Sequence, residues 1–488
     1  MSFAKCALIV GSGPAGVAAA MKLQSLGIST MMIDTNLNDS DEYLEINPEV
    51  AKKRKLIFGS DYPYRHFNFG PKITLKGAGL PCSFAQGGFS TLWGASFLPF
   101  SRNDISHWPI DLDGLKLGYE FVASKVPISS TSNRKLVNYD DYQNQRNLKP
   151  DQVFRLTDSS MLHHKNLEIG GSRLTVRTSM NNNSDCIHCG KCLSGCGIGS
   201  IWSSKDELNA LIKGGLMYLS GERVLVIRSN SDDFSVDTIS KDGSVRNIDG
   251  FSKVFLAAGN VETFRILARS GMTDTFADVQ HSTTFYFPSI ISKRKLYNTN
   301  NFGLSQVFIR LQNDSKESEA HFQLYSLSNE MFINMTKRIP IFKLIPLRIR
   351  SKLMSKIVMS IGYTNAEHVS ALKFALMQNG DCEIQGEFLS SRRVIKKNLR
   401  RKVLRSNKAF RKLGLITFSR FLVLGLPGDG VHAGGWLVSG DKCDDMGSPV
   451  AQKGVHVIDS SVLPSIPDGP ITFTIMANAV RIVSEVYK

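Results

Sequence analysis

The sequence predicts an α/β protein in which a parallel sheet with flanking helices is assembled from separated stretches of the chain, beside a second α+β domain built on an antiparallel sheet. Two observations predict this organisation. A strand, a glycine-rich turn and a helix open the chain, and the same succession returns near residue 255 before a last strand and helix close it. A length of 488 residues also suits two domains better than one.

The opening succession has the spacing of a dinucleotide-binding fingerprint. Gly11 makes the tight turn, Gly13 lets a pyrophosphate approach the backbone, and Gly16 allows close packing of helix and strand. Asp34, at the end of the second strand, can accept hydrogen bonds from ribose hydroxyls. This pattern indicates a Rossmann-like domain but fits FAD and NAD equally. The elements expected here are strands at 7–10 and 28–33 and a helix at 17–23.

Later stretches narrow the choice of cofactor. Residues 87–94 form a second glycine-rich loop, residues 255–271 predict a strand, a glycine turn and a helix, and residues 455–486 predict a short strand and the closing helix. In this order the motifs resemble the glucose–methanol–choline (GMC) oxidoreductases, FAD enzymes that oxidise alcohols and sugars. The stretches that carry the resemblance are 1–130, 186–282 and 431–488. The family places its substrate-binding domain in the remaining middle region.

The resemblance implies a discontinuous FAD-binding domain and assigns residues to the cofactor. Val224 would meet the adenine, and Asp459 the ribityl chain. Leu92 stands where some relatives bond the flavin covalently through a histidine, so non-covalent FAD is implied. The full set of residues implied along FAD is Gly11, Gly13, Gly16, Asp34, Gly87, Gly88, Ser90, Val224, Gly259, Asp459 and Pro470.

Oxidation of an alcohol needs a base for the hydroxyl proton and a hydride acceptor, which in a flavoenzyme is flavin N5. His432 stands in the position of the family's active-site histidine, and an imidazole suits the base. A histidine among glycines is otherwise an ordinary loop residue. The family's second His or Asn, before the last helix, is replaced here by Gly469 or Pro470. Asp468 is the candidate that could take over its role.

Four of the eight cysteines gather in one short loop: Cys186, Cys189, Cys192 and Cys196. Their spacing matches the run with which ferredoxins hold an iron–sulfur cluster, although glycine follows the last cysteine where ferredoxins have proline. Three interpretations stand beside one another: an iron–sulfur cluster, a metal-free structural loop, and zinc, for which the close spacing of the ligand pairs is least suitable. With a cluster, electrons would leave the flavin singly, and the enzyme would be a dehydrogenase.

The surplus of positive charge lies in one segment. The chain has 59 Lys and Arg against 43 Asp and Glu, and residues 331–412 carry +15 of the net +16. Within them, residues 392–412 hold eleven basic residues and no acid, and on a helix one face would collect Ile395, Leu399, Val403, Phe410 and Leu413. Such a basic amphipathic helix either lies on an anionic membrane surface or packs its narrow stripe on its own domain.

These observations lead to three hypotheses. The first is an FAD-dependent dehydrogenase or oxidase acting on the CH–OH group of a sugar or of a lipid-linked or phosphorylated alcohol, with His432 as base. The second is a flavin and iron–sulfur protein at a membrane surface that passes electrons between a redox partner and a quinone or polyprenyl substrate. The third is a non-enzymatic basic protein that binds a membrane or nucleic acid. The intact dinucleotide motifs argue against it, and motifs for nucleic acid are absent from the sequence.

The predicted division is an FAD-binding domain of residues 1–282 and 431–488, which contains the cysteine loop 186–196, and a substrate domain of residues 283–430, which contains the basic insert 331–412. Strands are expected at 306–311 and 321–327. No apolar run reaches the length of a membrane-spanning helix, and the first apolar stretch does not resemble a secretory signal. The expectation is a cytoplasmic protein, peripheral at the inner face of the membrane if the basic helix binds lipid.

Overall fold

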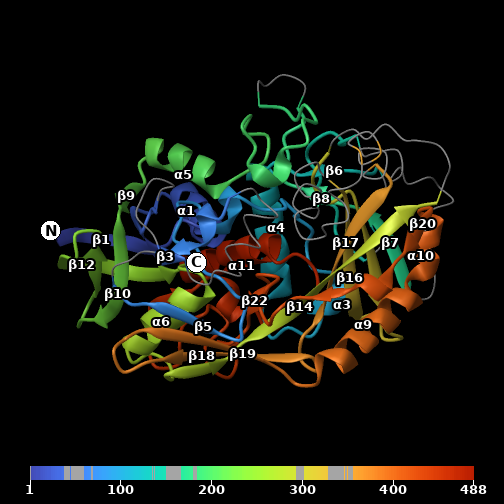
Figure 1. The fold of residues 1–488 in the computed structure, drawn as a ribbon. Helices are drawn as coiled ribbons and strands as arrows, with labels where there is room; N and C mark the ends of the chain where they lie inside the picture. Colours follow the sequence, from blue (N-terminus) through green and yellow to red (C-terminus); the bar gives the residue numbers. More distant parts are fainter. Residues whose placement is uncertain are drawn as a thin grey trace.

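The computed structural model describes residues 2–37, 44–45, 60–66, 70–133, 136, 138–149, 166–179, 184–292, 302–327, 346, 349 and 355–488. These residues form a mixed α/β protein with three larger sheets (Figure 1). The predicted fold class, a Rossmann-like domain beside an antiparallel sheet, is confirmed.

The first sheet presents the N-terminal glycine turn. β1 (Ser2–Val10) lies at its centre, parallel to β2 (Thr30–Asp34) on one side and to β12 (Val245–Leu256) on the other. Buried apolar residues fill the last part of β1, as expected for a parallel strand covered on both faces. The remaining strands of this sheet are β9 (Met217–Ser220), β10 (Glu222–Ser229), β11 (Phe234–Ser240) and β23 (Val455–Val457).

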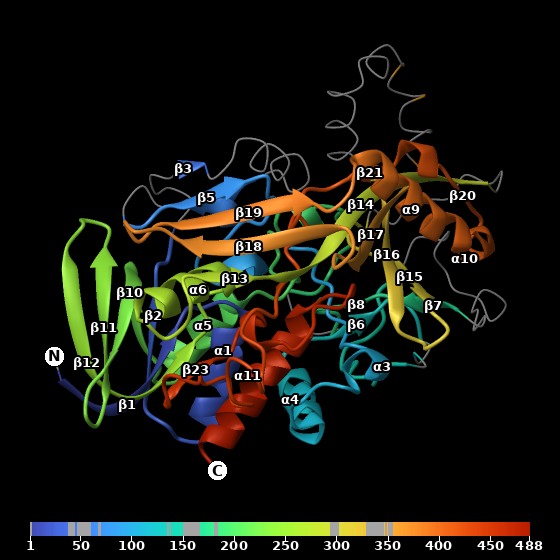
Figure 2. The same ribbon diagram turned by 90° about the horizontal axis from the view of Figure 1, so that it is seen from below.

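The helices that cover this sheet come from both ends of the chain. α11 (Thr472–Val486) packs against α1 (Pro14–Ser25) and α4 (Leu112–Lys125), as both views show (Figures 1 and 2). Gly118 permits the close approach of α4, because a Cβ there would overlap the carbonyl oxygen of Ala477. The other helices of this part are α3 (Arg102–Ile105), α5 (Ser204–Lys213) and α6 (Asn260–Arg269).

The second sheet is antiparallel, and the basic helix packs on it. Its strands are, in order, β20 (Leu415–Thr417), β14 (Gln280–Ile291), β17 (Ile357–Asn365), β16 (Ser318–Ser326), β15 (Val307–Gln312) and β7 (Leu167–Gly171), with β21 (Val423–Leu424) and β22 (Ala433–Gly434) also paired to β14. Ile395, Leu399 and Val403 of α9 (Arg392–Arg405) are buried in the core of this sheet (Figure 2). The apolar stripe of the amphipathic helix therefore packs on its own domain. The helix also ends earlier than expected, since the chain turns at buried Ser406 before α10 (Asn407–Lys412).

A third, four-stranded sheet lies beside α6 in Figure 2. Its strands are β13 (Phe276–Asp278), β18 (Ser370–Leu376), β19 (Cys382–Phe388) and β5 (Ile73–Lys76). The short elements are β3 (Leu44–Glu45), β4 (Arg65–His66), β6 (Ser129–Ser130), β8 (Arg173–Leu174), η1 (Tyr62–Tyr64), η2 (Gly88–Thr91), η5 (Cys192–Ser194), η7 (Ser419–Phe421) and η8 (Ser460–Val462).

The structure departs from the predicted division into 1–282 with 431–488 and 283–430. β7 and β5 belong to the first range, yet they pair with β15 and β19 of the second. Strands so far apart in sequence pair through tertiary contacts, which no local pattern reveals. Most of residues 331–354 of the basic insert lie outside the described residues. In the described part of the chain, no helix combines the length and apolar character needed to cross a membrane.

Candidate functional site

A large cavity extends from the glycine turn after β1 to the antiparallel sheet. Its volume of about 1480 Å³ exceeds the roughly 300–1,000 Å³ of most small-molecule sites. Of the predicted residues, Gly11, Gly13, Asp34, Gly88, Ser90, Val224, Gly259, His432, Asp459 and Pro470 line it. Gly16, Gly87 and Asp468 do not line it.

Three helices begin at this cavity without a side-chain cap. The first residues of α1, α6 and α11 all line its wall, and their N-cap residues, Gly13, Gly259 and Ile471, have no side chain that caps the helix. The first N–H groups of a helix need acceptors, and the helix dipole adds a partial positive charge there. This donor set fits a bound dinucleotide, whose pyrophosphate is anionic. The residues present therefore fit FAD.

The glycines of the first turn have the steric roles predicted for them. Gly11 has φ of +101°, and a Cβ on it would come within 2.5 Å of the carbonyl oxygen of Ala257. A Cβ on Gly16 would overlap the carbonyl oxygen of Gly11, so a side chain there would force α1 away from β1. A Cβ on Gly13 would meet no atom within 4 Å, and Gly13 faces the cavity. The open space is therefore on the side where a pyrophosphate would approach.

Ser12 joins the two glycine-rich loops, a role that the sequence did not suggest. Its backbone N–H donates to Asp34 Oδ2 at 2.6 Å, and its Oγ accepts from the N–H of Gly87 at 2.9 Å. The carboxylate of Asp34 is buried, and burial raises its pKa in spite of these hydrogen bonds. Asp34 is thus held at the cavity wall, where it remains available to a ribose. No local signal marks Ser12, because its partners lie 22 and 75 residues away.

The second glycine-rich loop packs against the start of α5, on the side away from the cavity. Gly87 has φ of +81°, and a Cβ there would lie 2.7 Å from the backbone nitrogen of Lys205. Its carbonyl oxygen accepts hydrogen bonds from Ser90 Oγ at 2.7 Å and Ser204 Oγ at 2.8 Å. Gly87 therefore positions the loop, whereas Gly88 and Ser90 face the cavity.

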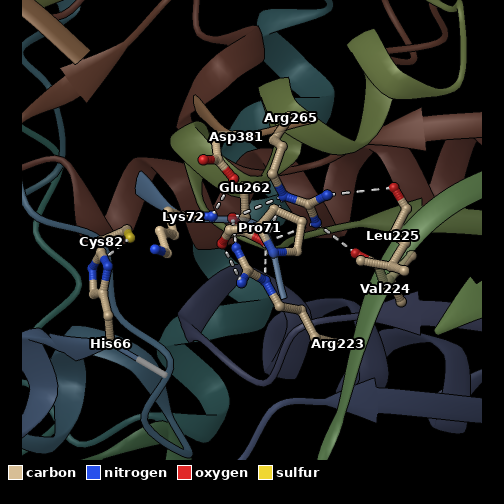
Figure 3. A network of polar contacts seen from close by, with 10 residues as sticks. All are labelled: His66, Pro71, Lys72, Cys82, Arg223, Val224, Leu225, Glu262, Arg265 and Asp381. Atoms are coloured by element: carbon tan, nitrogen blue, oxygen red, sulfur yellow. Dashed lines mark hydrogen bonds and ion pairs between the residues drawn. The ribbon is translucent and has the colours of Figure 1, made fainter. Parts of the chain in front are cut away.

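A buried ionic network fixes β10 to α6 at the Val224 end of the cavity (Figure 3). Glu262 accepts from Arg223 at 2.7 and 3.0 Å and from Arg265 at 2.9 Å. Burial alone would raise the pKa of Glu262, but the charges of Arg223 and Arg265 outweigh burial and hold the pKa well below its usual value. Arg265 also donates to the carbonyl oxygen of Val224 at 2.6 Å. The network therefore sets the position of the backbone at Val224.

The sequence did not reveal this network. The spacing of Glu262 and Arg265 on one helix predicts a local ion pair. Arg223, however, is 39 residues away from Glu262.

Asp459 and Gly259 form the wall between α6 and the last strand. Gly259 has φ of +80° and immediately precedes α6. Asp459 accepts from Thr263 Oγ1 at 2.5 Å and from the N–H of Ser461 at 2.9 Å. Burial raises the pKa of Asp459 against these hydrogen bonds. Its carboxylate is held at the cavity wall close to the start of α6, consistent with the contact to FAD implied for it.

His432 lies on the loop before β22, and its surroundings keep the imidazole neutral. The side chain is half-buried in the cavity wall, and its ring stacks on Tyr363 of β17. Burial lowers the pKa of His432 to about 4, so the imidazole is neutral at pH 7. Its Nδ1 has no hydrogen-bond partner within the described residues. The preceding Val431 has φ of +62°, a conformation that costs a β-branched residue on the order of 1–3 kcal/mol and is often found at functional sites.

Asp468 lies behind the cavity, in a separate buried cluster. Burial and the charge of Asp104 raise the pKa of Asp468 to about 7, against the opposing effects of Arg310 and Lys402. Arg310 in turn pairs with Asp104 at 2.6 Å. This position suits a residue that anchors the loop before α11. Asp468 itself does not line the cavity, and its role as a replacement for the second catalytic residue stays a prediction.

The four clustered cysteines line one small cavity of about 20 Å³, which is room for a single water molecule. The N–H of Ser200 donates to Cys196 Sγ at 3.3 Å. No group of three or more His, Cys, Asp or Glu side chains in the described ranges is arranged to hold a metal ion. In this arrangement the loop has no ready metal centre, and the iron–sulfur cluster stays a prediction. Leu193 of the same loop lines the large cavity, so the loop forms part of its wall.

Comparisons with known proteins agree with this geometry. A family model described as an FAD binding domain matches residues 5–43, which contain most of β1 and all of α1 and β2. Among solved structures, pyridoxine 4-oxidase from Mesorbium loti has a similar fold, with a TM-score of 0.60 and 13% sequence identity over 99% of each chain. A search of curated proteins finds no match to the sequence. The fold and the matched domain together support an FAD-dependent oxidoreductase.

Proposed function

We propose that the protein uses FAD to oxidise a CH–OH group, with His432 taking the hydroxyl proton. The observation that carries this proposal is a half-buried, neutral imidazole in the wall of the same cavity at which α1, α6 and α11 begin. When bound, FAD supplies the hydride acceptor. The similar solved structure is named as a pyridoxine 4-oxidase, which fits an oxidative reaction.

Different residues along the cavity would bind different parts of FAD and the substrate. The N-terminus of α1, with Gly13, would bind the pyrophosphate, and Asp34 would bind the ribose. The backbone at Val224 would contact the adenine, held there by Arg265. At the other end, His432 is oriented by Tyr363 and faces a cavity wall to which the N-terminus of α11 also contributes. A neutral imidazole accepts a proton without first losing one, which is the requirement for a general base.

The test is the rate at which an alcohol substrate reduces the bound flavin in the absence of oxygen. His432→Ala and His432→Asn should lower this rate by roughly 10²- to 10⁴-fold, the usual contribution of a general base, while FAD content stays unchanged. His368→Ala is the matched control, because His368 is exposed and does not line the cavity. Flavin that is reduced at the wild-type rate in both His432 variants would exclude this role and favour a protein that only carries electrons.

A second candidate concerns how electrons leave. All four clustered cysteines line one small cavity, their spacing is that of a ferredoxin run, and Leu193 of their loop lines the large cavity. These features favour a test of whether Cys186, Cys189, Cys192 and Cys196 would hold an iron–sulfur cluster that takes electrons singly. Anaerobic purification followed by iron and acid-labile sulfide assays tests this. Stoichiometric iron and sulfide that Cys196→Ser abolishes would support a dehydrogenase. Flavin without iron would leave the loop structural and direct the search to peroxide-forming oxidation.

The remaining hypotheses make different predictions. An electron-transfer protein acting on a quinone or polyprenyl substrate would keep reduction by its donor in His432→Ala. A non-enzymatic membrane- or nucleic-acid-binding protein would show no reduction of bound flavin by any alcohol.

A further inference from the structure

The part of the cavity farthest from the glycine turn is apolar and is formed by the antiparallel sheet. The residues that carry this observation are Ile290, Met359, Phe418, Phe421, Val423 and Leu424. They come from β14, β17, β21 and the segment around η7, which neighbour one another in the sheet. Since water and sugars bind poorly to such a lining, this half of the cavity favours an apolar chain.

The apolar lining continues to the protein surface. Ile290, Phe421 and Val423 line the cavity, yet their exposed fractions are 38%, 64% and 59%. Ile416, which lies opposite Ile290 in the β14–β20 pair, is 52% exposed. We call these four residues the cavity mouth. Contiguous exposed apolar residues at the rim of a cavity are unusual on soluble proteins and mark an interaction site.

The basic helix α9 lies directly beside the cavity mouth. Arg392, its first residue, lines the cavity, and α9 contacts η7. Arg400 donates to the carbonyl oxygens of Ser419 and Arg420 at 3.1 and 3.0 Å, which fastens the helix to the segment that carries Phe421. Arg393, Lys397 and Arg401 of α9 are exposed, and residues 392–412 contain no acidic residue.

This surface has the composition of a protein that lies on a lipid interface. Exposed apolar side chains insert at the boundary of headgroups and acyl chains, and neighbouring cations are attracted to anionic lipids. The apolar stripe of α9 is not available to the lipid, because Ile395, Leu399 and Val403 already pack on the sheet. The helix can still supply the charge, while the cavity mouth supplies the apolar contact.

We propose that the cavity mouth docks on an anionic lipid bilayer, and that the alcohol to be oxidised carries an apolar chain that passes from the bilayer into the cavity. The identity of the oxidised group rests on the proposed function, whereas the docking does not. A substrate delivered in this way avoids exposure of its apolar chain to water. The polar end of the same chain would reach His432, at which the apolar half of the cavity ends.

Flotation of the FAD-loaded protein with vesicles tests the docking without turnover. Vesicles of phosphatidylcholine alone are compared with equimolar phosphatidylcholine and phosphatidylglycerol. Binding should be strong only to the anionic vesicles. Replacement of one exposed cation, such as Lys397→Ala, should weaken it about fivefold. The double variant Phe421→Ser with Val423→Ser should weaken it at least roughly tenfold, because both side chains lose their place in the lipid.

The matched control is Phe276→Ser with Val450→Ser. These two side chains are 71% and 76% exposed but do not line the cavity. Three results would each overturn the docking. The mouth and control variants could lose binding equally, the protein could bind neutral and anionic vesicles equally, or the mouth variant could bind as well as the wild type. FAD content, read from absorbance, shows that each variant is folded.

A second measurement separates this inference from the proposed function. Flavin reduction is followed with a prenyl alcohol held in anionic vesicles and with a short, water-soluble alcohol. If the mouth variant slows the reaction with the vesicle-bound alcohol more than the reaction with the soluble alcohol, the delivery of an apolar chain is supported. If it slows both reactions equally, or neither, while the wild type reacts with both alcohols, delivery through the mouth is wrong. Failure of every alcohol would refute the proposed chemistry, and flotation would still decide the docking.

Discussion

The imidazole of His432 and the phenol ring of Tyr363 are stacked, with ring centroids 4.8 Å apart and planes 21° apart. The two rings come from different parts of the chain, since Tyr363 lies on β17 and His432 follows the strained Val431. The stack therefore fixes the orientation of the imidazole toward the cavity that both residues line. If His432 is the base that we propose, its imidazole needs little rearrangement before it accepts a proton.

Loss of the stack should slow the reaction more than loss of the hydroxyl group. Aromatic pairs contribute about 0.5–1.5 kcal/mol beyond their buried area. Tyr363→Leu should therefore lower the rate of flavin reduction by roughly two- to tenfold, whereas Tyr363→Phe should stay close to wild type. Stopped-flow absorbance under anaerobic conditions measures both rates. A loss in the Phe variant equal to that in the Leu variant would assign the effect to the hydroxyl group.

The pH dependence of the reaction should reflect the burial of His432, which lowers its pKa to about 4. Flavin reduction should be constant through neutral pH and fall only as the pH approaches about 4. The free energy of unfolding should also fall as the pH falls. A histidine in the unfolded chain binds a proton below about pH 6.5, whereas His432 in the fold does so only near about pH 4, so His432 destabilises the fold progressively between these two values. The assignment of the base to His432 would be contradicted if the rate of flavin reduction already fell near about pH 6.5 and the same fall remained in His432→Asn.

Glu262→Gln should destabilise the protein strongly at neutral pH. It leaves Arg223 and Arg265 buried without their carboxylate, and breaking a buried ion pair typically costs about 3–5 kcal/mol. The lowered pKa of Glu262 means that its contribution is present above the usual glutamate pKa and is lost as pH falls below it. The difference in melting temperature between wild type and variant should therefore narrow below about pH 4.

The control for this variant is Glu485→Gln. Its partner Lys488 lies in a surface ion pair, for which the expected effect is below about 1 kcal/mol. Similar losses in both variants would mean that the buried network does not hold β10 to α6.

Gly13→Ala and Gly16→Ala should fail in different ways. The Cβ introduced by Gly13→Ala would meet no protein atom, and the φ of −63° at this position suits alanine, so the variant should fold but bind FAD weakly. A Cβ at position 16 would overlap the carbonyl oxygen of Gly11, so this variant should lose stability even without FAD. Thermal melting of the FAD-free protein and FAD titration distinguish the two effects. Gly197→Ala, where a Cβ also meets nothing, is the control.

Features encoded by neighbouring residues could be predicted from the sequence. The turn between β1 and α1 depends on spacing within six residues, and the helix expected at 472–486 has the bounds of α11. Features that depend on distant partners could not. The predicted amphipathic face of 392–412 is present, but only the sheet beneath it shows that Leu399 is buried. Asp468 is a candidate only because it stands next to Gly469 and Pro470 in sequence, and no local pattern shows that Asp104 and Arg310 are its charged neighbours in space.

The placement of α11 against α1, and of β23 beside β12, has a consequence for biosynthesis. The glycine turn after β1 leaves the ribosome long before α11, the helix that covers it, because α11 lies so much later in the sequence. At about 5–20 residues per second, the interval is on the order of tens of seconds. During this time the apolar face of α1 lacks its final partner, and the cavity lacks the wall formed by Asp459 and Ile471. The complete cavity therefore forms only after α11 has been synthesised, and until then the apolar face of α1 stays without the helix that covers it.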